Sequence, residues 1–243
     1  MKVKGIEEKN ASKYPCGGEL GMNPWTQMWL NYFPRAAKGN EAYFEKYRLD
    51  GFEKEHRVIR SALMELERGI QGMLVLPPPV RSFLAQAEKG TFVIRRISEA
   101  GSGVKAEGYH LKEQDGQLFL MAAEEKGVLY GVFDLLRRIA MEESLKGVDV
   151  LCNPDNPNRM LNHWDNMNGS IERGYSGESF FFAENEILVN ERTRDYARFV
   201  ASVGLNGVVI NNVNVKDAAT YLITERYFDR VAELSNVFAD YGI

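Results

Sequence analysis

Cysteine is scarce in this sequence. Only two of the 243 residues are cysteines, Cys16 and Cys152, and they lie far apart in the chain. Such a pair forms neither a disulfide framework nor the close spacing of a cysteine metal motif. We therefore expect two ordinary thiols and no metal site, with a bridge between them as the less favoured alternative.

Long runs of basic residues and long runs of apolar residues are missing as well. Basic residues are scattered and the formal net charge is −4, which argues against nucleic acid as the main partner. No apolar run approaches the roughly 18 residues that a membrane-spanning helix needs. The first residues, MKVKGIEEKNASKYP, lack the apolar stretch of a secretory signal. These absences predict a cytoplasmic protein that binds neither nucleic acid nor membranes.

The composition that is present is that of a globular protein. Hydrophobic residues make up 44% of the chain and aromatic residues 11%, which is enough for one or two domains with sizeable cores. Apolar residues at helical spacing predict a helix within residues 55–73. The run VLPPPV then ends any helix because proline cannot continue it. A second apolar face, from Leu129 to Ile139, predicts another helix.

Strand signals lie between these two helices. Residues 91–97, TFVIRRI, alternate like a half-buried strand. Within residues 108–123, Asp115 and Gly116 separate two strand-like runs, which is a strong hairpin signal. Residues 1–151 therefore predict a small α/β domain.

The Pro- and Asn-rich segment 152–158, CNPDNPN, predicts a linker, and the pattern changes after it. Short apolar strands now alternate with amphipathic helices, which implies parallel pairing. We predict a buried strand in RMLNHW, a helix in RTRDYARFVASVG, a strand in GVVINN and a helix in ERYFDRVAELSNVFADYG. Residues 159–243 thus predict the first two βα units of a (β/α)₈ barrel. Because a two-stranded parallel sheet leaves both edges open, we expect the chain to be a truncated N-terminal fragment of a longer protein.

A dense polar cluster follows the first strand of this second part. His163, Trp164, Asp165 and Asn166 come at its carboxyl end, and Asn211 to Asn214 come at the carboxyl end of the next strand. In a (β/α)₈ barrel these ends converge on the mouth that holds the active site. Amide and imidazole groups suit sugar hydroxyls, and an indole face suits a pyranose ring.

Each of these residues also has a plain structural explanation. A single His after a strand is more often a satisfied structural residue, a single Trp is usually core, and Asn often caps a turn. Polar clusters at the same end of consecutive strands shift the balance towards a binding site.

The residues of this region resemble a known family. The segments RMLNHWDNMNGSIERGYSG and YARFVASVGLNGVVINNVN are similar to the start of the catalytic barrel of glycoside hydrolase family 67, the α-glucuronidases. The upstream EGYHLKEQDGQLFLMAAEEKGVLYGVFDLLRRI resembles the small α/β domain that precedes that barrel, a domain also found before the barrels of β-hexosaminidases. The resemblance covers the chain from about residue 15 to its end.

The resemblance implies an activity. It implies hydrolysis, during xylan breakdown, of the α-1,2 bond between (4-O-methyl)glucuronic acid and xylose in short xylo-oligosaccharides, the aldouronic acids. Such enzymes invert, using an acid and a base carboxyl about 6.5–9.5 Å apart with water between them. Both catalytic carboxyls would lie beyond residue 243. No cofactor is implied. The expected ligand is the small oligosaccharide, and a homodimer of the full-length protein is an open alternative.

The resemblance also assigns residues to the substrate. Trp164 would form a wall of the uronic-acid pocket, and Val213 would lie near the methyl group. The complete set of expected substrate-binding residues is His163, Trp164, Asp165, Asn166, Asn212 and Val213. One departure stands out, because Met167-Asn168 replaces the family's usual Leu-Asp and removes a carboxylate.

Three alternatives remain beside this interpretation. Asp165 and Glu172 are two carboxylates on one loop, but we expect them to orient that loop rather than to serve as acid and base. The chain could instead be a non-catalytic carbohydrate-binding module that uses Trp25 and Trp164. It could also belong to a β-hexosaminidase-like glycosidase, although that family is not expected to open its barrel with NHWDN and ERGY.

Overall fold

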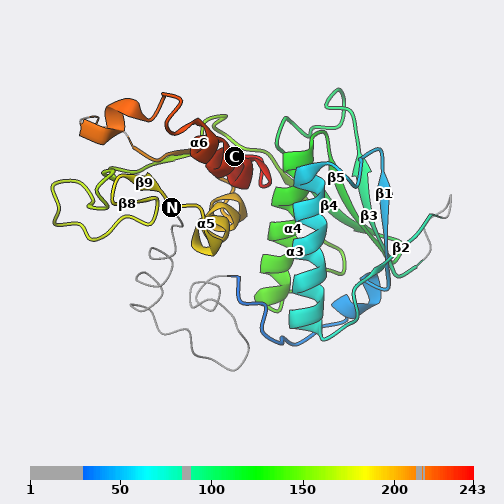
Figure 1. Cartoon of the computed structure of the whole chain (residues 1–243). Helices are drawn as coiled ribbons and strands as arrows, with labels where there is room; N and C mark the ends of the chain where they lie inside the picture. Colours follow the sequence, from blue (N-terminus) through cyan, green and yellow to red (C-terminus); the bar gives the residue numbers. More distant parts are fainter. Residues whose placement is uncertain (1–29, 84–88, 212–214, 216) are drawn as a thin grey trace. The chain divides into compact units, whose positions relative to one another are not determined.

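The computed structural model describes residues 30–83, 89–211, 215 and 217–243. Residues 32–243 form one compact unit, in which a six-stranded sheet with two long helices is followed by a smaller group of strands and helices (Figure 1). Cys16 and Trp25 lie outside the described residues, whereas Cys152 is an exposed free thiol.

The larger sheet is mixed, with strand order β2-β1-β3-β5-β4-β6. Strands β2, β1, β3 and β5 run parallel, and β4 runs antiparallel to both of its neighbours. The strands are β1 (Lys46–Asp50), β2 (Val80–Arg81), β3 (Thr91–Arg96), β4 (Tyr109–Gln114), β5 (Gln117–Ala122) and β6 (Asp149–Cys152). A short 3₁₀ helix, η1 (Asn40–Tyr43), precedes β1.

Helices α3 (Arg57–Leu74) and α4 (Glu125–Ala140) lie side by side on one face of this sheet (Figure 1). Both predicted apolar faces are confirmed, because their residues are buried between helices and sheet. Gly69 allows the two helices to approach closely, since a Cβ there would lie 2.3 Å from the side chain of Leu136. The α3 helix ends before the proline run, as predicted.

The predicted hairpin is confirmed as β4 and β5. Asp115 and Gly116 both have positive φ, 55° and 79°, which is the geometry of a two-residue type I′ turn. The expectation for β3 was only partly right, because Thr91 to Ile94 are all buried instead of alternating. On the sheet face opposite the helices, Val93 is paired with Arg48 of β1 and Phe119 of β5, and these long side chains cover it.

The segment predicted as a linker is pinned to the sheet. Its first residue, Cys152, still belongs to β6 and pairs with Tyr109. Asn153 accepts a hydrogen bond from the Lys105 amide at 2.8 Å and donates one to the Gly103 carbonyl at 2.9 Å. The chain therefore leaves the sheet along a fixed path.

Residues 159–243, here called the barrel segment, contain the predicted βα units. Strands β7 (Met160–Asn162) and β10 (Gly207–Val209) pair in parallel, as predicted, with α5 (Glu191–Ser202) between them in the chain. The further elements are β8 (Phe182–Ala183), β9 (Glu186–Ile187), the 3₁₀ helix η2 (Asp217–Tyr221) and α6 (Phe228–Ala239). Asn190 starts α5 with a reciprocal capping box, and Gly204 follows the helix with φ +76°.

The expectation that β7 is buried was wrong for this chain. Met160 is 53% exposed and Asn162 is also exposed. The reason is the pairing, because within the described residues β7 has β10 as its only strand partner. The barrel segment instead has its own apolar cluster beneath the strands, formed by residues that include Met167, Phe181, Phe182, Ile187, Tyr227 and Phe238.

Polar contacts join the barrel segment to residues 32–152, here called the sheet domain. Arg198 of α5 donates Nε and Nη2 hydrogen bonds of 2.5 and 2.7 Å to the Glu65 carboxylate of α3. Both side chains are buried, at 7% and 1% exposure. Burial disfavours the guanidinium charge, but the hydrogen bonds and charge of Glu65 outweigh it and raise the pKa of Arg198. Tyr32 adds a 2.8 Å hydrogen bond to the same carboxylate.

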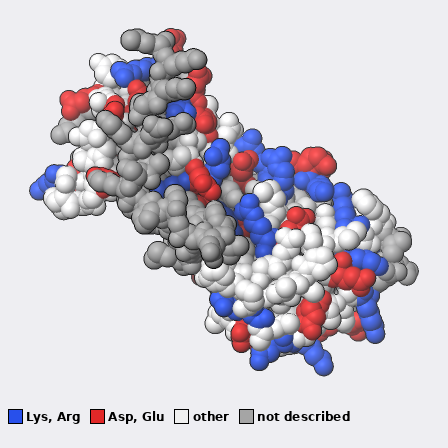
Figure 2. All heavy atoms as spheres, turned by 60° about the horizontal axis from the view of Figure 1, so that its bottom comes forward, with Lys and Arg blue, Asp and Glu red and all other residues white. Residues whose placement is uncertain are grey.

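A second junction lies around Glu107. Its carboxylate receives hydrogen bonds from Lys126 at 2.8 Å, Arg159 at 2.5 Å and Asn206 at 3.0 Å. Elsewhere charges of both signs are mixed, and the face shown in Figure 2 has Lys and Arg interspersed with Asp and Glu. None of the described helices is long and apolar enough to cross a membrane.

Candidate active site

The site is built on the carboxyl ends of β7 and β10. These parallel strands pair Asn162 with Val209, and the His163 amide then donates to the Val209 carbonyl at 2.8 Å. One residue further, Trp164 and Asn211 form an isolated bridge. Trp164 of the first predicted polar stretch therefore meets Asn211, the one residue of the second stretch that the structure describes.

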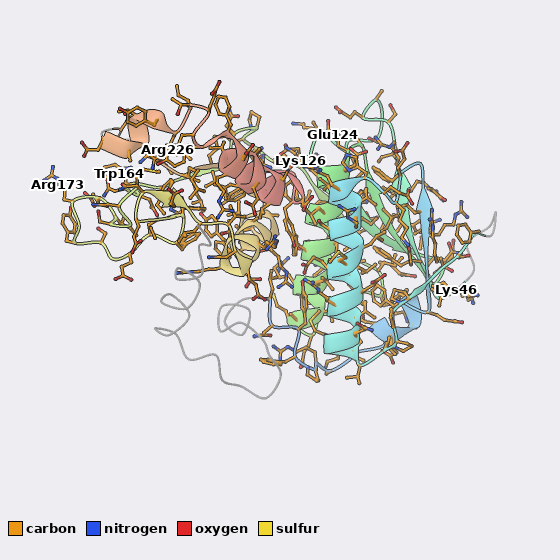
Figure 3. All side chains as sticks on the ribbon, viewed as in Figure 1. Lys46, Glu124, Lys126, Trp164, Arg173 and Arg226 are labelled. Carbon is orange, nitrogen blue, oxygen red and sulfur yellow. The ribbon has the colours of Figure 1, made fainter. Side chains whose placement is uncertain are left out.

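Trp164 is the most exposed aromatic at this strand end. Its side chain is 42% exposed, and Figure 3 shows it beside the β8–β9 ribbon with Arg173 farther out. An exposed indole beside polar groups can stack on the apolar face of a sugar while its N–H meets a polar partner. The structure therefore places a partly exposed indole at this strand end.

His163 turns into the protein. Its Nε2 lies 2.5 Å from the Tyr196 hydroxyl, and its Nδ1 lies 3.6 Å from Asp165 Oδ1. The ring also makes edge contacts with Phe181 at 5.1 Å and with Phe180 at 6.1 Å between ring centroids. Both ring nitrogens thus face protein groups, and the expectation that His163 binds substrate stays a prediction.

Asp165 is 2% exposed and lies beneath the site. Its Oδ2 accepts a short hydrogen bond from Ser179, and its backbone carbonyl accepts one from Asn211 Nδ2 at 2.6 Å. Ser179 Oγ in turn accepts the amide hydrogen bonds of Phe181 and Phe182, each at 3.0 Å. The carboxylate therefore ties the strand end to the start of β8.

Asn166 closes the base of the loop that follows. Its Nδ2 donates to Ser170 Oγ at 2.9 Å and to the Glu172 carbonyl at 2.8 Å. The Glu172 amide donates to the Trp164 carbonyl at 2.8 Å, so the loop folds back on the strand end. Asn168 accepts hydrogen bonds from the Ser170 amide and hydroxyl, a role that either Asn or Asp can fill. The departure from the family pattern therefore removes a charge but keeps the turn.

The outer part of the loop has its own fixed geometry. Glu172, at φ +54°, accepts hydrogen bonds from the Tyr175 hydroxyl at 2.7 Å and from Ser176 Oγ at 3.3 Å. That carboxylate raises the pKa of Tyr175 through the hydrogen bond, with burial and charge adding to the effect. The side chain of Tyr175 is nonetheless 70% exposed.

Two expected residues, Asn212 and Val213, lie outside the described residues. Three residues that shape the site were not among those expected: Tyr196, Ser179 and Tyr175. Tyr196 reads in sequence as part of an amphipathic helix, and no local pattern links it to His163 across 33 positions. Serine and tyrosine within a glycine-rich loop give an equally weak signal.

The two carboxylates nearest to Trp164 in sequence, Asp165 and Glu172, are both hydrogen-bonded to neighbouring hydroxyls. Asp165 is buried and bonded to Ser179, whereas the Glu172 oxygens accept from Tyr175 and Ser176. Both carboxylates accept hydrogen bonds from loop hydroxyls, and the expectation that they orient the loop rather than act as acid and base stays a prediction. No group of three or more His, Cys, Asp or Glu that could hold a metal occurs in the part of the chain that the structure describes. The described site therefore consists of the partly exposed Trp164 indole and the hydrogen-bonded polar residues around it.

Comparison with known families identifies two domains. Residues 28–135 match the model described as "Glycosyl hydrolase family 67 N-terminus", and residues 138–243 match "Glycosyl hydrolase family 67 middle domain". The two matches meet between residues 135 and 138, within α4, whereas the sheet continues to Cys152. The domain boundary expected at residue 151 therefore stays a prediction.

Curated relatives agree with this match. "Probable alpha-glucuronidase A" of Aspergillus terreus is 33% identical over 93% of this chain and 27% of its own length. "Alpha-glucuronidase A" of Emericella nidulans is 34% identical over 77% and 24%, and "Alpha-glucuronidase" of Hypocrea jecorina is 31% identical over 96% and 29%. The chain thus spans about a quarter of the length of the relatives that it matches.

Solved structures share the fold. A family 138 glycoside hydrolase targeting pectin rhamnogalacturonan II superposes with a TM-score of 0.55 at 13% identity, over 82% of this chain and 24% of that one. A family 115 4-O-methyl-α-glucuronidase with specificity for decorated arabinogalactans gives 0.52 at 14% identity, over 83% and 28%. At such low identities these likenesses show a common architecture alone.

Proposed function

Because this chain belongs to glycosyl hydrolase family 67, we propose that the whole protein is an α-glucuronidase. The chain consists of the family's N-terminal domain and the start of its barrel domain. The proposed reaction is hydrolysis of the α-1,2 bond between (4-O-methyl)glucuronic acid and xylose in xylo-oligosaccharides, with inversion at the anomeric carbon. The proposed partner is this small oligosaccharide.

The observation that carries the proposal is the placement of Trp164. The indole is exposed at the carboxyl end of β7, directly beside the end of the parallel strand β10. In (β/α)₈ enzymes the chemistry takes place at this end of the strands. An indole there can form one wall of a sugar pocket while polar neighbours fix its position.

The contribution of this chain to the reaction is binding and orientation. Trp164 would hold the sugar ring, and the scaffold of Asp165, Asn166 and Ser179 would keep the strand end and its loop in place. An inverting reaction also needs an acid and a base on opposite sides of the bond, about 6.5–9.5 Å apart. Asp165 and Glu172 are engaged in holding the loop, so we assign the two catalytic carboxyls to residues outside this chain.

The direct test uses the whole protein encoded at this locus. Incubation with reduced aldotriouronic acid should release methylglucuronic acid, and NMR observation of the first product should show the β-anomer that inversion requires. A chito-oligosaccharide substrate serves as the counter-test, because its cleavage would favour the β-hexosaminidase-like alternative. Absence of glucuronic acid release by a folded whole protein would reject the proposal.

Residues 1–243 alone provide the second test. We expect no release of glucuronic acid from aldotriouronic acid by this chain, since its described carboxylates near Trp164 are held by neighbouring hydroxyls. Activity clearly above a blank would return attention to Asp165 and Glu172. Tight glycan binding without hydrolysis, by both this chain and the whole protein, would favour the binding-module alternative.

A further inference from the structure

A chain of polar groups runs from helix α5 to the loop of the site. Tyr196 of α5 contacts His163 Nε2 at 2.5 Å, His163 Nδ1 faces Asp165 at 3.6 Å, and Asp165 accepts from Ser179. Its four members come from three segments: the end of β7, the residues before β8 and helix α5. This row of polar groups lies directly beneath the strand end that carries Trp164.

The direction of the hydrogen bonds follows from the groups at the two ends. Burial, and after it the charge of Asp165, raises the pKa of Tyr196. The phenol therefore stays protonated, and its O–H can donate a hydrogen bond to His163 Nε2. A neutral imidazole that accepts at Nε2 carries its proton on Nδ1. That proton faces Asp165 Oδ1 at 3.6 Å, and the negative charge there favours this tautomer of His163.

The His163 ring has little freedom to turn. It meets the edges of Phe181 and Tyr196 at centroid distances of 5.1 and 5.4 Å, with interplanar angles of 86° and 77°. A rotation of the ring would break both the aromatic contacts and the Tyr196 hydrogen bond. The imidazole is therefore held by shape as well as by polarity.

Helix α5 is itself held from its other side. Arg198, two positions after Tyr196, forms the buried ion pair with Glu65 of the sheet domain. Side chains two positions apart on a helix point in different directions, so α5 can contact the sheet domain and the site at the same time. The sheet domain thereby supports the residue that contacts His163.

We propose that Tyr196 is a positioning residue of the site: its hydroxyl fixes the His163 ring, and through His163 and Asp165 it fixes the strand end that presents Trp164. Asp165 reaches that strand end through its own backbone, because Asn211 bonds to its carbonyl at 2.6 Å. The effect on catalysis rests on the function proposed above, whereas the effect on His163 does not.

The first experiment examines the tautomer of His163 in residues 1–243. The chain contains three histidines, so their ¹⁵N imidazole signals can be assigned with His→Gln variants. At neutral pH, His163 should carry its proton on Nδ1 and accept a hydrogen bond at Nε2. Tyr196→Phe should remove that bond, move the Nε2 signal and populate both tautomers. His110, whose Nε2 lies 2.5 Å from Asp149, is the internal reference and should not change.

Two results of this experiment would overturn the proposal. One is a His163 proton on Nε2, or on both nitrogens, in the wild-type chain. The other is an unchanged His163 spectrum in Tyr196→Phe. Should that variant fail to fold, Asp165→Asn gives the same information from the other ring nitrogen, and an unchanged His163 spectrum there would have the same meaning.

The second experiment measures kinetics in the whole protein. Tyr196→Phe should raise KM for aldotriouronic acid by about two- to tenfold, the size expected for one lost hydrogen bond, with a smaller change in kcat. Tyr227→Phe is the matched control, because the variant loses a 2.7 Å hydrogen bond from a buried tyrosine hydroxyl to the Asn185 carbonyl, and this bond involves none of the groups described above as contacting His163. An equal rise of KM in both variants would show general loosening and would reject a positioning role.

The two experiments separate the possible failures. A whole protein that folds but does not cleave aldouronic acids would reject the proposed function, while the NMR result would still decide whether Tyr196 fixes His163. An altered His163 spectrum together with unchanged kinetics in an active enzyme would reject the positioning role alone.

Discussion

The sheet domain and the barrel segment both combine strands with helices, but their strands differ in how completely they are paired and buried. In the sheet domain, β3 and β5 each have a partner on both sides, and Leu118 and Leu120 are fully buried. In the barrel segment, β7 and β10 have only each other within the described residues, and every residue of these two strands is at least partly exposed. The number of paired strands, rather than the composition, therefore sets the burial.

This difference shows what holds each part together. Apolar burial dominates the sheet domain, where two helices cover one face of a six-stranded sheet. The barrel segment has an apolar cluster of its own and is joined to the sheet domain by polar contacts, in which Glu65 and Glu107 hold Arg198 and Arg159. We therefore expect the stability of the barrel segment to depend on the sheet domain.

The largest expected effect comes from breaking the buried ion pair. Arg198→Ala removes the buried two-bond guanidinium partner of the Glu65 carboxylate, which keeps Tyr32 and the exposed Arg68 at 3.5 Å, and removal of one partner of a buried pair typically costs about 3–5 kcal/mol. Urea unfolding of residues 1–243 would measure the loss. Limited proteolysis should also cut the barrel segment before the sheet domain.

A double variant gives the control for this prediction. Replacing both partners, with Glu65→Leu and Arg198→Met, removes the uncompensated charge and should cost clearly less than Arg198→Ala alone. If the double variant is the less stable of the two, the ion pair contributes directly to stability and the orphaned charge is not the main cost.

A matched pair of leucines compares the two sheets. Leu120→Ala in β5 removes a fully buried side chain and should cost about 2–5 kcal/mol of unfolding free energy. Leu161→Ala in β7 removes a partly exposed side chain and should cost markedly less in residues 1–243. In the whole protein, where we propose that further strands cover β7, the two costs should converge. Equal costs in the shorter chain would contradict the comparison.

A Trp164→Ala variant tests whether this side chain contributes to function or to stability. Trp164→Ala in the whole protein should lower kcat/KM by about 10- to 1000-fold, which corresponds to about 1.4–4 kcal/mol of transition-state binding. Its melting temperature should change much less than that of Phe181→Ala, which opens a cavity in the apolar cluster. A Trp164→Ala protein that unfolds readily but keeps normal kinetics would place the indole in the core.

The smallest expected effect is the pH dependence of the junction at Glu107. Burial raises the pKa of this carboxyl, but the hydrogen bonds and charges of Lys126 and Arg159 outweigh it, so the pKa lies below its usual 4.5. The unfolded chain then takes up the proton at a higher pH than the folded chain does. The contribution to stability is complete above the usual pKa and is lost as the pH falls through the lowered value.

A comparison of urea midpoints would test this contribution. Wild type and Glu107→Gln should differ most near neutral pH, and the difference should shrink as the pH falls through the lowered pKa of Glu107, below which both side chains are neutral. A constant difference across this range would mean that Glu107 acts through hydrogen bonds alone.

Local patterns in the sequence predicted most of the elements. The hairpin at Asp115-Gly116, the two long helices and the parallel βα units all depend on short-range rules of turn chemistry and periodicity. The expected burial of β7 failed because burial depends on neighbouring strands, which no local pattern encodes. The half-buried expectation for β3 failed for the same reason, since Arg48 and Phe119 cover it from adjacent strands.

By itself, the sequence determined the family, the two long helices, the hairpin and the βα units, and the position of Trp164 at a strand end. These features follow from motifs and from the two-residue period of strands, which any reader of the chain can apply. Only the tertiary structure decided that His163 faces Tyr196, that Asp165 lies beneath the site and that Arg198 reaches Glu65. The physical reason is sequence separation. These contacts join segments that come close only after the strands and helices have packed, so the chemistry of one residue does not identify its partner.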